Sequence, residues 1–292
     1  MDYNQLLQLL IKNALVEDIG TGDYSTLSTI EIDAEGKAIL KIKDNGVLAG
    51  MDVAAKFFRY VQPNIKFNAL KKDGDLTKIG EIAFEVKAKI HTILQCERLV
   101  LNCMQRMSGI ATLTKQYAQK LLPYKTQLLD TRKTTPNFRL LEKEAVRIGG
   151  GINHRFGLYD MIMLKDNHID YCGGIEKAII KAWSYIEQYH PDLKIVVEAR
   201  NLVDVKKVIT LVRTDNSADK GQINRIMLDN FTTEQIVAAL KIIDGALETE
   251  ASGGINLNNI ESYAATGVDY ISCGAIIHQA KSMDLSMKAV GI

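Results

Sequence analysis

Hydrophobic and polar positions follow two different patterns, which divide the chain near residue 110. Before it, residues 2–16 carry apolar side chains at helical spacing, and the runs 37–43 and 82–90 alternate apolar with polar. Such alternation is typical of a strand with one face buried and one in water. Asn45-Gly46 between two β-prone runs predicts a hairpin turn, because both central positions of that turn need φ > 0. This first part is therefore predicted to be a mixed α/β unit.

A long helix is predicted from about Glu97 to Leu122, with the domain boundary inside it. From residue 127 onward, short apolar strands alternate with amphipathic helices. The predicted strands are Gln127–Leu129, Met161–Leu164, Ile195–Val197, Ile226–Leu228, Leu247–Thr249 and Tyr270–Ile271. The predicted helices cover 174–189, 202–212, 233–243 and 256–265. Alternating elements of this size imply parallel strands joined by right-handed crossovers.

Polar residues or glycines follow every one of these strands. The groups are Asp130 to Lys133, Lys165 to His168, Glu198 with Arg200, Asp229 with Asn230, Ser252 to Gly254, and Ser272 with Gly274. The carboxyl ends of parallel strands are where α/β folds build their sites. A doubly wound sheet is possible, but polar groups after all six strands favour a barrel. Six strands instead of eight indicate an incomplete barrel.

Charge and cysteine usage narrow the possible partners. With 36 basic and 35 acidic residues the net charge is +1, which argues against nucleic-acid or membrane partners, since both usually require a basic excess. The four cysteines form no C-x-x-C pair and are expected to be reduced thiols of a cytoplasmic protein. The N-terminal stretch is too polar for a signal peptide, and no apolar run reaches the roughly 18 residues of a membrane helix.

The charged groups after the strands indicate an anionic substrate. Arg and Lys bind carboxylates and phosphates, and acidic residues beside a phosphate commonly hold Mg²⁺ or sugar hydroxyls. The glycines of 149–151 and 252–254 would let backbone N–H groups approach an anion, and Asn256 would cap a helix facing it. Each feature alone is more often a solvated turn, a structural histidine or a flexible loop. Together they predict a substrate with several negative charges, such as a sugar phosphate.

Several motifs, spread almost from end to end, carry a resemblance to a known family. They are the segments 14–23, 97–112, 130–136 (Asp-Thr-Arg-Lys-Thr-Thr-Pro), 149–155, 164–168, 227–230, 250–255 (Glu-Ala-Ser-Gly-Gly-Ile) and 266–269. In these motifs the sequence resembles the quinolinate phosphoribosyltransferases. The resemblance implies transfer of the phosphoribosyl group of phosphoribosyl pyrophosphate to quinolinate with decarboxylation. The products are nicotinate mononucleotide, pyrophosphate and CO₂, in NAD synthesis.

The resemblance also implies an architecture. An N-terminal α/β sandwich would cover 1–110 and be joined by the C-terminal tail 277–292, and an incomplete α/β barrel would form the catalytic domain over 111–276. The protein would be a homodimer with composite sites, each completed by Arg98 of the neighbouring subunit.

The motifs imply roles for individual residues. Arg132, His154, Arg155 and Lys165 match groups that hold the quinolinate carboxylates, and Thr131 is expected among the substrate-binding residues. Lys133, Glu198 and Asp229 are the expected catalytic residues, around phosphoribosyl pyrophosphate and its Mg²⁺. Any metal contact of the two acids would be made through that Mg-bound substrate. The loops expected to receive the 5′-phosphate contain Ser252, Gly253, Gly254, Ser272 and Gly274.

Some positions depart from the family pattern, and alternatives stay open. Val196 stands where many members have an acid, Asn137 where glycine is frequent, and 213–224 is predicted to be a longer surface loop. One alternative is a homologue of the same fold with another ring substrate, such as the molybdenum-transport-associated one. Another is an aldolase forming a Schiff base on Lys165. The third is a sensor that binds a sugar phosphate without turnover.

Overall fold

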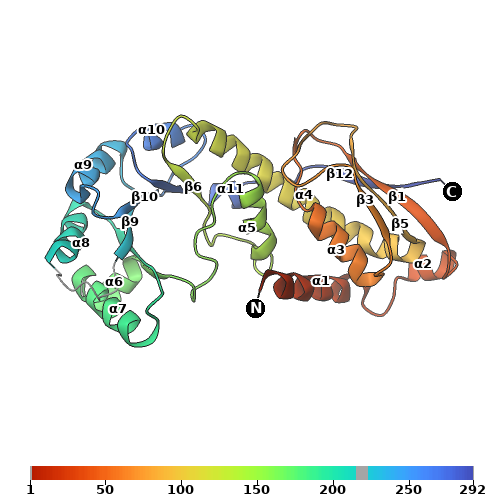
Figure 1. The fold of residues 1–292 in the computed structure, drawn as a ribbon, viewed down its shortest axis with the longest axis horizontal. Coiled ribbons are helices and arrows are strands. Elements are labelled where there is room, and N and C mark those ends of the chain that lie inside the picture. The colour runs from red at the N-terminus through yellow and green to blue at the C-terminus, as the bar shows by residue number, and fades with distance from the viewer. Residues whose placement is uncertain (1, 215–222, 292) are drawn as a thin grey trace. The chain divides into compact units, whose positions relative to one another are not determined.

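The computed structural model describes residues 2–214 and 223–291, which form two compact units (Figure 1). The N-terminal unit comprises Met1–Lys115, Lys133–Gly151 and Ile276–Ile292, and the barrel unit comprises Gln116–Arg132 and Ile152–Ala275. Most of the loop predicted over 213–224, namely its positions 215–222, lies outside the described residues.

Four antiparallel strands form the main sheet of the N-terminal unit, in the order β12-β1-β5-β3. Their bounds are β12 (Leu285–Val290), β1 (Glu35–Ile42), β5 (Ile82–Lys89) and β3 (Lys66–Ala69). The predicted alternation is present, since Leu40, Ile42 and Phe84 are fully buried. Phe58 of helix α3 (Met51–Val61) packs edge-on against Phe84 with ring centroids 6.2 Å apart. A helix therefore covers the apolar face of this sheet.

The Asn45-Gly46 hairpin predicted from the sequence is wrong. Strand β2 (Gly46–Val47) pairs with β4 (Leu76–Thr77) in a separate two-stranded sheet, whereas β1 pairs with β5 and β12. Neither Asn45 nor Gly46 adopts a positive φ. The glycine is needed for close packing instead, because a Cβ at Gly46 would lie 2.5 Å from the Thr112 hydroxyl oxygen. Tertiary contact, and not turn chemistry, accounts for this glycine.

Helix α4 (Ile90–Leu121) contains the predicted long helix and begins seven residues earlier than expected, at Ile90 instead of Glu97. It runs through Gly109 and into the barrel unit. A Cβ at Gly109 would lie 2.0 Å from the backbone oxygen of Lys281, so only glycine lets the returning chain pass. The remaining helices of the N-terminal unit are α1 (Tyr3–Ile19), α2 (Tyr24–Thr29) and α5 (Arg139–Ile148). The short α11 (Ala275–His278) lies where the two units join in the sequence.

The segment Lys133–Gly151 belongs to the N-terminal unit, although the sequence suggested that it would follow the barrel. It packs on α4 through two glycines of the triplet. A Cβ at Gly149 would lie 2.5 Å from the backbone oxygen of Ala111, and one at Gly151 would lie 2.7 Å from a methyl of Val146 in α5 and 3.1 Å from a methyl of Thr114 in α4. Close approach to a helix therefore accounts for these two glycines without any anion.

Six parallel strands form the sheet of the barrel unit, in the order β6-β11-β10-β9-β8-β7. Their bounds are β6 (Gln127–Leu129), β7 (Ile162–Leu164), β8 (Ile195–Ala199), β9 (Ile223–Asp229), β10 (Glu248–Ser252) and β11 (Tyr270–Ser272). Sequence neighbours from β7 to β11 lie side by side, and β11 then pairs with β6. This circular order, open only between β6 and β7, is that of an incomplete barrel and excludes a doubly wound sheet.

Helices follow the strands as predicted and pack outside the curved sheet (Figure 1). They are α6 (Asp166–Cys172), α7 (Ile175–Tyr189), α8 (Leu202–Thr214), α9 (Thr233–Ile243) and α10 (Ile260–Ala264). The prediction that Asn256 caps α10 is wrong, because Asn259 precedes the helix and the Asn256 carboxamide accepts from Asn258 N at 2.9 Å. Among residues 2–214 and 223–291, no helix is both long and apolar enough to cross a membrane.

The interior of the curved sheet is layered. Met163, Val196 and Met227, from β7, β8 and β9, pack together as one apolar layer. Side chains two residues further along a strand point to the same side. Lys165, Glu198 and Asp229 therefore lie one layer above it, at the carboxyl ends of the strands. Val196, which replaces an acid frequent in the family, belongs to the apolar layer and is 1% exposed.

Candidate active site

Glu198 is the buried acid at the carboxyl end of β8. Its side chain accepts a hydrogen bond from Asp166 N at 3.3 Å and lies 3.7 Å from the Lys165 ammonium. Burial raises the pKa of Glu198 above the ordinary carboxyl range; Lys165 opposes that rise, and the neighbouring charge of Asp229 adds to it. Loss of hydration and a second carboxylate both disfavour another negative charge here. A positive group placed between the two acids would relieve that repulsion.

Asp229, at the carboxyl end of β9, is held by its neighbours. The Ser252 hydroxyl donates to one carboxylate oxygen at 2.5 Å, and the Asn230 carboxamide donates to the other at 2.7 Å. Asn230 N also donates to the Ser252 backbone oxygen at 2.8 Å, which joins β9 to β10 above the sheet. Gly253 makes this arrangement possible, since a Cβ there would lie 2.1 Å from the Asn230 side-chain oxygen. The first glycine of the Ser-Gly-Gly motif thus leaves room for the group that orients Asp229.

Two arginines expected to bind carboxylates influence each other. Burial lowers the pKa of the Arg155 guanidinium, and the positive charge of Arg132 lowers it further. Arg155 also donates to the Met161 backbone oxygen at 3.1 Å. Arg132 itself is exposed. Arg132 and Arg155 are two neighbouring positive charges, and Arg132 is accessible from solvent. Their combined electrostatic field favours the binding of an anion.

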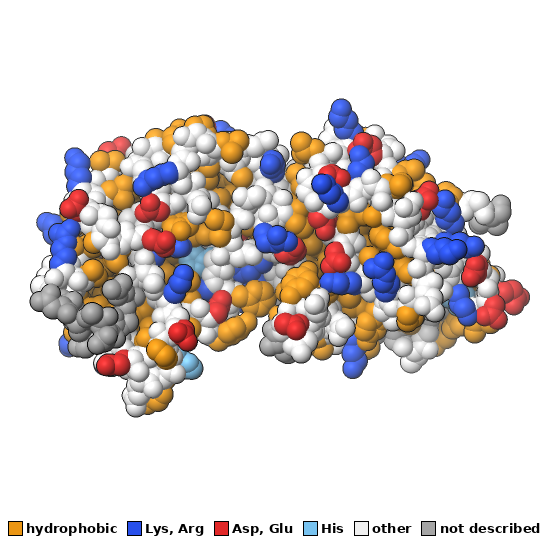
Figure 2. Space-filling view, viewed as in Figure 1, with side chains coloured by type: hydrophobic (Ala, Val, Ile, Leu, Met, Phe, Trp, Pro, Cys, Tyr) orange, Lys and Arg blue, Asp and Glu red, His pale blue; other side chains and the backbone are white. Residues whose placement is uncertain are grey.

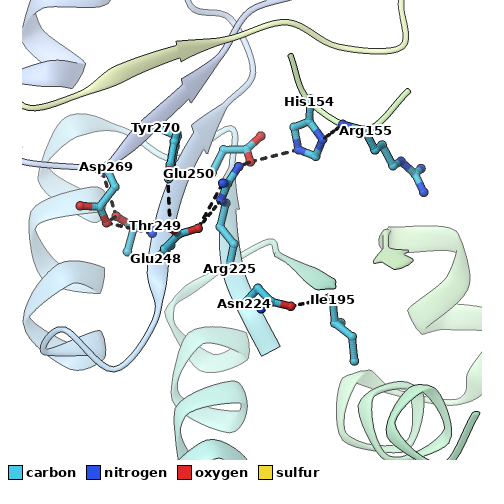
Figure 3. A network of polar contacts seen from close by, with 10 residues as sticks. All are labelled: His154, Arg155, Ile195, Asn224, Arg225, Glu248, Thr249, Glu250, Asp269 and Tyr270. Atoms are coloured by element: carbon cyan, nitrogen blue, oxygen red, sulfur yellow. Dashed lines mark hydrogen bonds and ion pairs between the residues drawn. The ribbon is translucent and has the colours of Figure 1, made fainter. Parts of the chain in front are cut away.

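His154 is buried and its polar atoms are engaged within the barrel unit (Figure 3). Its backbone N–H donates to Asp130 at 2.8 Å, and its Nδ1 accepts from Arg155 N at 2.7 Å. Its Nε2 lies 3.2 Å from Glu250, whose carboxylate also accepts from Arg225 at 3.0 Å. Both ring nitrogens therefore contact protein groups. The predicted contact of His154 with a substrate carboxylate stays a prediction.

Asp130, Glu250 and Arg225 were not identified as functional from the sequence. Asp130 and Glu250 are fully buried, and Asp130 also accepts from the Asn153 carboxamide at 2.7 Å. The sequence did offer one signal, namely a charged residue next to the apolar residues of a strand. Such a residue is expected to be buried, and a buried carboxylate requires a partner. The partners lie 23 to 96 residues away in the sequence, which is why spacing did not reveal them.

The remaining predicted residues occupy different places. Ser272 is buried on β11, and Gly254 has a φ of +65° with open space around it. Thr131 directly precedes Arg132 in the loop that follows β6, and Gly274 lies in the corresponding position after β11. Lys133 and Arg98 are exposed residues of the N-terminal unit, Arg98 on α4. Charges of both signs are interspersed over the face in Figure 2.

No cluster of three or more His, Cys, Asp or Glu side chains suited to a metal ion occurs among the described residues. Glu198 and Asp229 are only two. Mg²⁺ is commonly held by one or two carboxylates together with substrate phosphates and water. The two acids therefore suit a magnesium ion that arrives with a phosphate-bearing substrate.

Comparison with known proteins was consistent across most of the chain. Residues 23–108 match the N-terminal domain, and residues 110–288 the C-terminal domain, of quinolinate phosphoribosyl transferase. A chloroplastic nicotinate-nucleotide pyrophosphorylase [carboxylating] of Arabidopsis thaliana is 41% identical, over 97% of this chain and 82% of the relative. The quinolinate phosphoribosyltransferase [decarboxylating] 1b of Nicotiana tabacum is 42% identical over the same shares. The crystal structure of NadC from Streptococcus pyogenes has a TM-score of 0.88 at 38% identity, covering 100% of this chain and 99% of that one.

Proposed function

The chain belongs to the quinolinate phosphoribosyltransferase family and is a decarboxylating enzyme of NAD biosynthesis, and we propose that the side chains at the carboxyl ends of its barrel strands perform the reaction. The observation that carries the assignment of residues is the pair of acids Glu198 and Asp229 on adjacent strands. Lys165 contacts the first acid and Ser252 the second. The two carboxylates, Glu198 and Asp229, can face a sugar carbon that becomes positively charged during the reaction.

The transfer step follows from this arrangement. The pyridine nitrogen of quinolinate forms a bond to the anomeric carbon, the bond from that carbon to pyrophosphate breaks, and pyrophosphate keeps the electron pair. The sugar passes through an oxocarbenium-like state. Carboxylates fixed nearby stabilise that positive charge without reorganising, which is the role proposed for Glu198 and Asp229. Lys133 is proposed to contact the departing pyrophosphate as a point charge.

Magnesium is proposed to enter with phosphoribosyl pyrophosphate, and Glu198 and Asp229 would hold it. When bound, the ion neutralises charge on the departing pyrophosphate. Burial raises the pKa of Glu198 and the charge of Asp229 adds to that rise, so a cation between the two acids would be favoured.

Arg132, Arg155 and Lys165 are proposed to hold the two carboxylates of quinolinate and so align the ring, a positioning contribution. His154 is proposed to support this group. After transfer, the pyridinium ring accepts the electron pair of the breaking C–C bond, CO₂ leaves, and a proton replaces it on the ring. Thr131, Ser252, Gly253, Gly254, Ser272 and Gly274 are proposed to bind the remainder of the substrates, the last five at the 5′-phosphate.

A homodimer is proposed in which Arg98 completes the neighbouring site. Arg98 is exposed on α4, and no described residue forms an ion pair with it. An arginine without a local carboxylate is free to bind an anion brought to it. The sedimentation of the purified protein, together with complementation between Arg98→Ala and Glu198→Gln subunits, would test this.

Lys165 does not favour a Schiff-base aldolase. Its side chain is 48% exposed and lies beside Glu198. A Schiff-base lysine instead lies in a desolvated apolar pocket or next to another cationic group. Cytoplasmic location, expected from the four free thiols, stays a prediction, and the Arabidopsis relative is a chloroplast protein.

The test is a turnover assay with phosphoribosyl pyrophosphate and Mg²⁺ that follows nicotinate mononucleotide and CO₂. Quinolinate is expected to be consumed, with one CO₂ for each mononucleotide, and nicotinate is expected to be inert. Turnover of nicotinate without CO₂, or binding of phosphoribosyl pyrophosphate without any turnover, would contradict the proposal. The latter result would favour the sensor or a homologue with another ring substrate.

A further inference from the structure

Glu250 is a fully buried carboxylate inside the barrel unit. It lies on β10 in the same layer as Met227 of β9, and its exposed fraction is 0%. One of its carboxylate oxygens, Oε2, is shared by His154 Nε2 at 3.2 Å and Arg225 Nη1 at 3.0 Å (Figure 3). Burial alone would raise the pKa of Glu250, but hydrogen bonds from His154, Ser272 and Arg225 hold it below its ordinary value. Glu250 is therefore an ionised group that acts from inside the barrel.

His154 comes from the chain segment that lies along the open edge of the barrel. Ile152 N donates to the Leu128 backbone oxygen at 2.8 Å and Asp130 N donates to Ile152 O at 3.1 Å, so this segment extends the sheet beyond β6. From there His154 reaches Glu250 on β10, which is separated from β6 by β11. The contact with Glu250 thus joins the segment beside β6 to β10, the strand two positions away in the sheet.

The contacts of the imidazole define where its proton lies. Nδ1 accepts from the backbone N–H of Arg155 at 2.7 Å, and a nitrogen that accepts a hydrogen bond carries no proton. Nε2 must then carry it and donate to Glu250. A carboxylate is suited to this because it can only accept, so it selects the Nε2–H form. Glu250 thereby keeps His154 Nδ1 unprotonated, so that this nitrogen can accept the hydrogen bond from Arg155 N.

Arg225 contacts a second carboxylate in addition to Glu250. It forms an ion pair with Glu248 at 3.1 Å, and its guanidinium lies 3.7 Å above the Tyr270 ring. Tyr270 in turn donates to Glu248 at 3.2 Å. Glu248 therefore shares Arg225 with Glu250, but its side chain is 50% exposed at the start of β10, which makes it a matched control.

We propose that Glu250 is a positioning residue for quinolinate binding, acting through the Nε2–H tautomer of His154 on the backbone of Arg155. This inference rests on the proposed function, in which Arg155 binds a carboxylate of quinolinate. Glu250 itself touches no reacting atom in this account. Loss of the Glu250 carboxylate is therefore expected to impair the binding of quinolinate and not that of phosphoribosyl pyrophosphate.

The experiment compares Glu250→Gln with Glu248→Gln in the full-length enzyme. The carboxamide introduced by Glu250→Gln can donate as well as accept, so it no longer selects the tautomer. The KM for quinolinate is expected to rise about tenfold in Glu250→Gln, since a hydrogen bond to a charged group is lost. The KM for phosphoribosyl pyrophosphate is expected to stay within about twofold in both variants, and Glu248→Gln is expected to change neither. Equal changes for both substrates, or the same defect in both variants, would assign Glu250 a merely structural role and overturn the proposal.

A second measurement is read from the wild-type protein. Imidazole ¹⁵N spectra of ¹⁵N-histidine-labelled wild-type protein, with His154 assigned through His154→Gln, are expected to show the Nε2–H tautomer. A proton on Nδ1 or on both nitrogens would overturn the inference even if quinolinate is turned over. Absence of quinolinate turnover in the wild type would instead overturn the proposed function, while the tautomer would still decide the geometry.

Discussion

Replacing Gly253 with alanine tests whether the Ser-Gly-Gly motif works by making room for the group that orients Asp229. The new Cβ would lie 2.1 Å from the Asn230 side-chain oxygen and 3.0 Å from its backbone nitrogen. Carbon and oxygen normally approach no closer than about 3.3 Å, so the Asn230 side chain must move by about 1 Å. That movement would break its 2.7 Å hydrogen bond to Asp229.

The magnitude has two parts. At φ +91° alanine is strained by about 1–2 kcal/mol, partly offset by the lower entropy of the unfolded chain. Displacing Asn230 and losing a hydrogen bond to a charged acceptor adds about 2–4 kcal/mol. Gly245→Ala is the control, since Gly245 has a φ of +72° but nothing within 4 Å and lies before β10, at the other end of the strand.

The assay is urea unfolding together with steady-state kinetics for both variants. Gly253→Ala is expected to unfold about 2–4 kcal/mol more easily than Gly245→Ala, with kcat/KM for phosphoribosyl pyrophosphate lowered about 10–100-fold, because Asp229 loses its orientation. Gly245→Ala is expected to keep the activity of the wild type. If the two variants are alike in both measurements, the clash with Asn230 has no functional consequence and the reasoning is refuted.

The other predictions concern the substrate, the metal and the core. Arg132→Ala is expected to lower kcat/KM for quinolinate about 100-fold or more with an unchanged melting temperature, because Arg132 is exposed; near wild-type kinetics would remove its assigned role. Treatment with a chelator is expected to abolish turnover, and added Mg²⁺ to restore it; persistent turnover would exclude the proposed metal. Gly109→Ala is expected to destabilise the protein by about 2 kcal/mol or more in urea unfolding, because the overlap with Lys281 O costs more than the gain of about 1 kcal/mol in helix propensity. The control is Asn102→Ala at an exposed position of the same helix, which is expected to be neutral or stabilising. A stabilised Gly109→Ala would show that the clash is relieved at no cost.

Local elements of the barrel unit could be predicted well from the sequence. Strand β6 and helix α9 have the predicted bounds, Gln127–Leu129 and Thr233–Ile243. Apolar runs between polar clusters are enough to predict these bounds, because the local spacing of apolar residues determines which face of a strand or helix is buried. The parallel order and the incomplete barrel followed from the alternation of strands and helices. Glu198 and Asp229 lie at the carboxyl ends of β8 and β9, where the sequence predicted these charged residues to be.

Long-range packing limited the remaining predictions. Asn45-Gly46 has the composition of a hairpin turn, yet Thr112 and Met283 occupy the space where a Cβ would lie, and β1 pairs elsewhere. Gly149 and Gly151 have the composition of an anion loop, yet they pack on α4. For Gly46 and Gly149 a distant segment, and not the local dipeptide, determines why glycine is required.

The sequence by itself determined the two-part chain, the strand and helix order, and the set of charged groups at the strand ends, since these depend on local period and on family motifs. Only the tertiary structure decided what each charge touches. It joined His154 to Glu250 across 96 positions and Asp229 to Ser252 across 23. Buried charges must find partners wherever the fold brings them. Contact geometry therefore decided how His154 is oriented, which residue type alone left open.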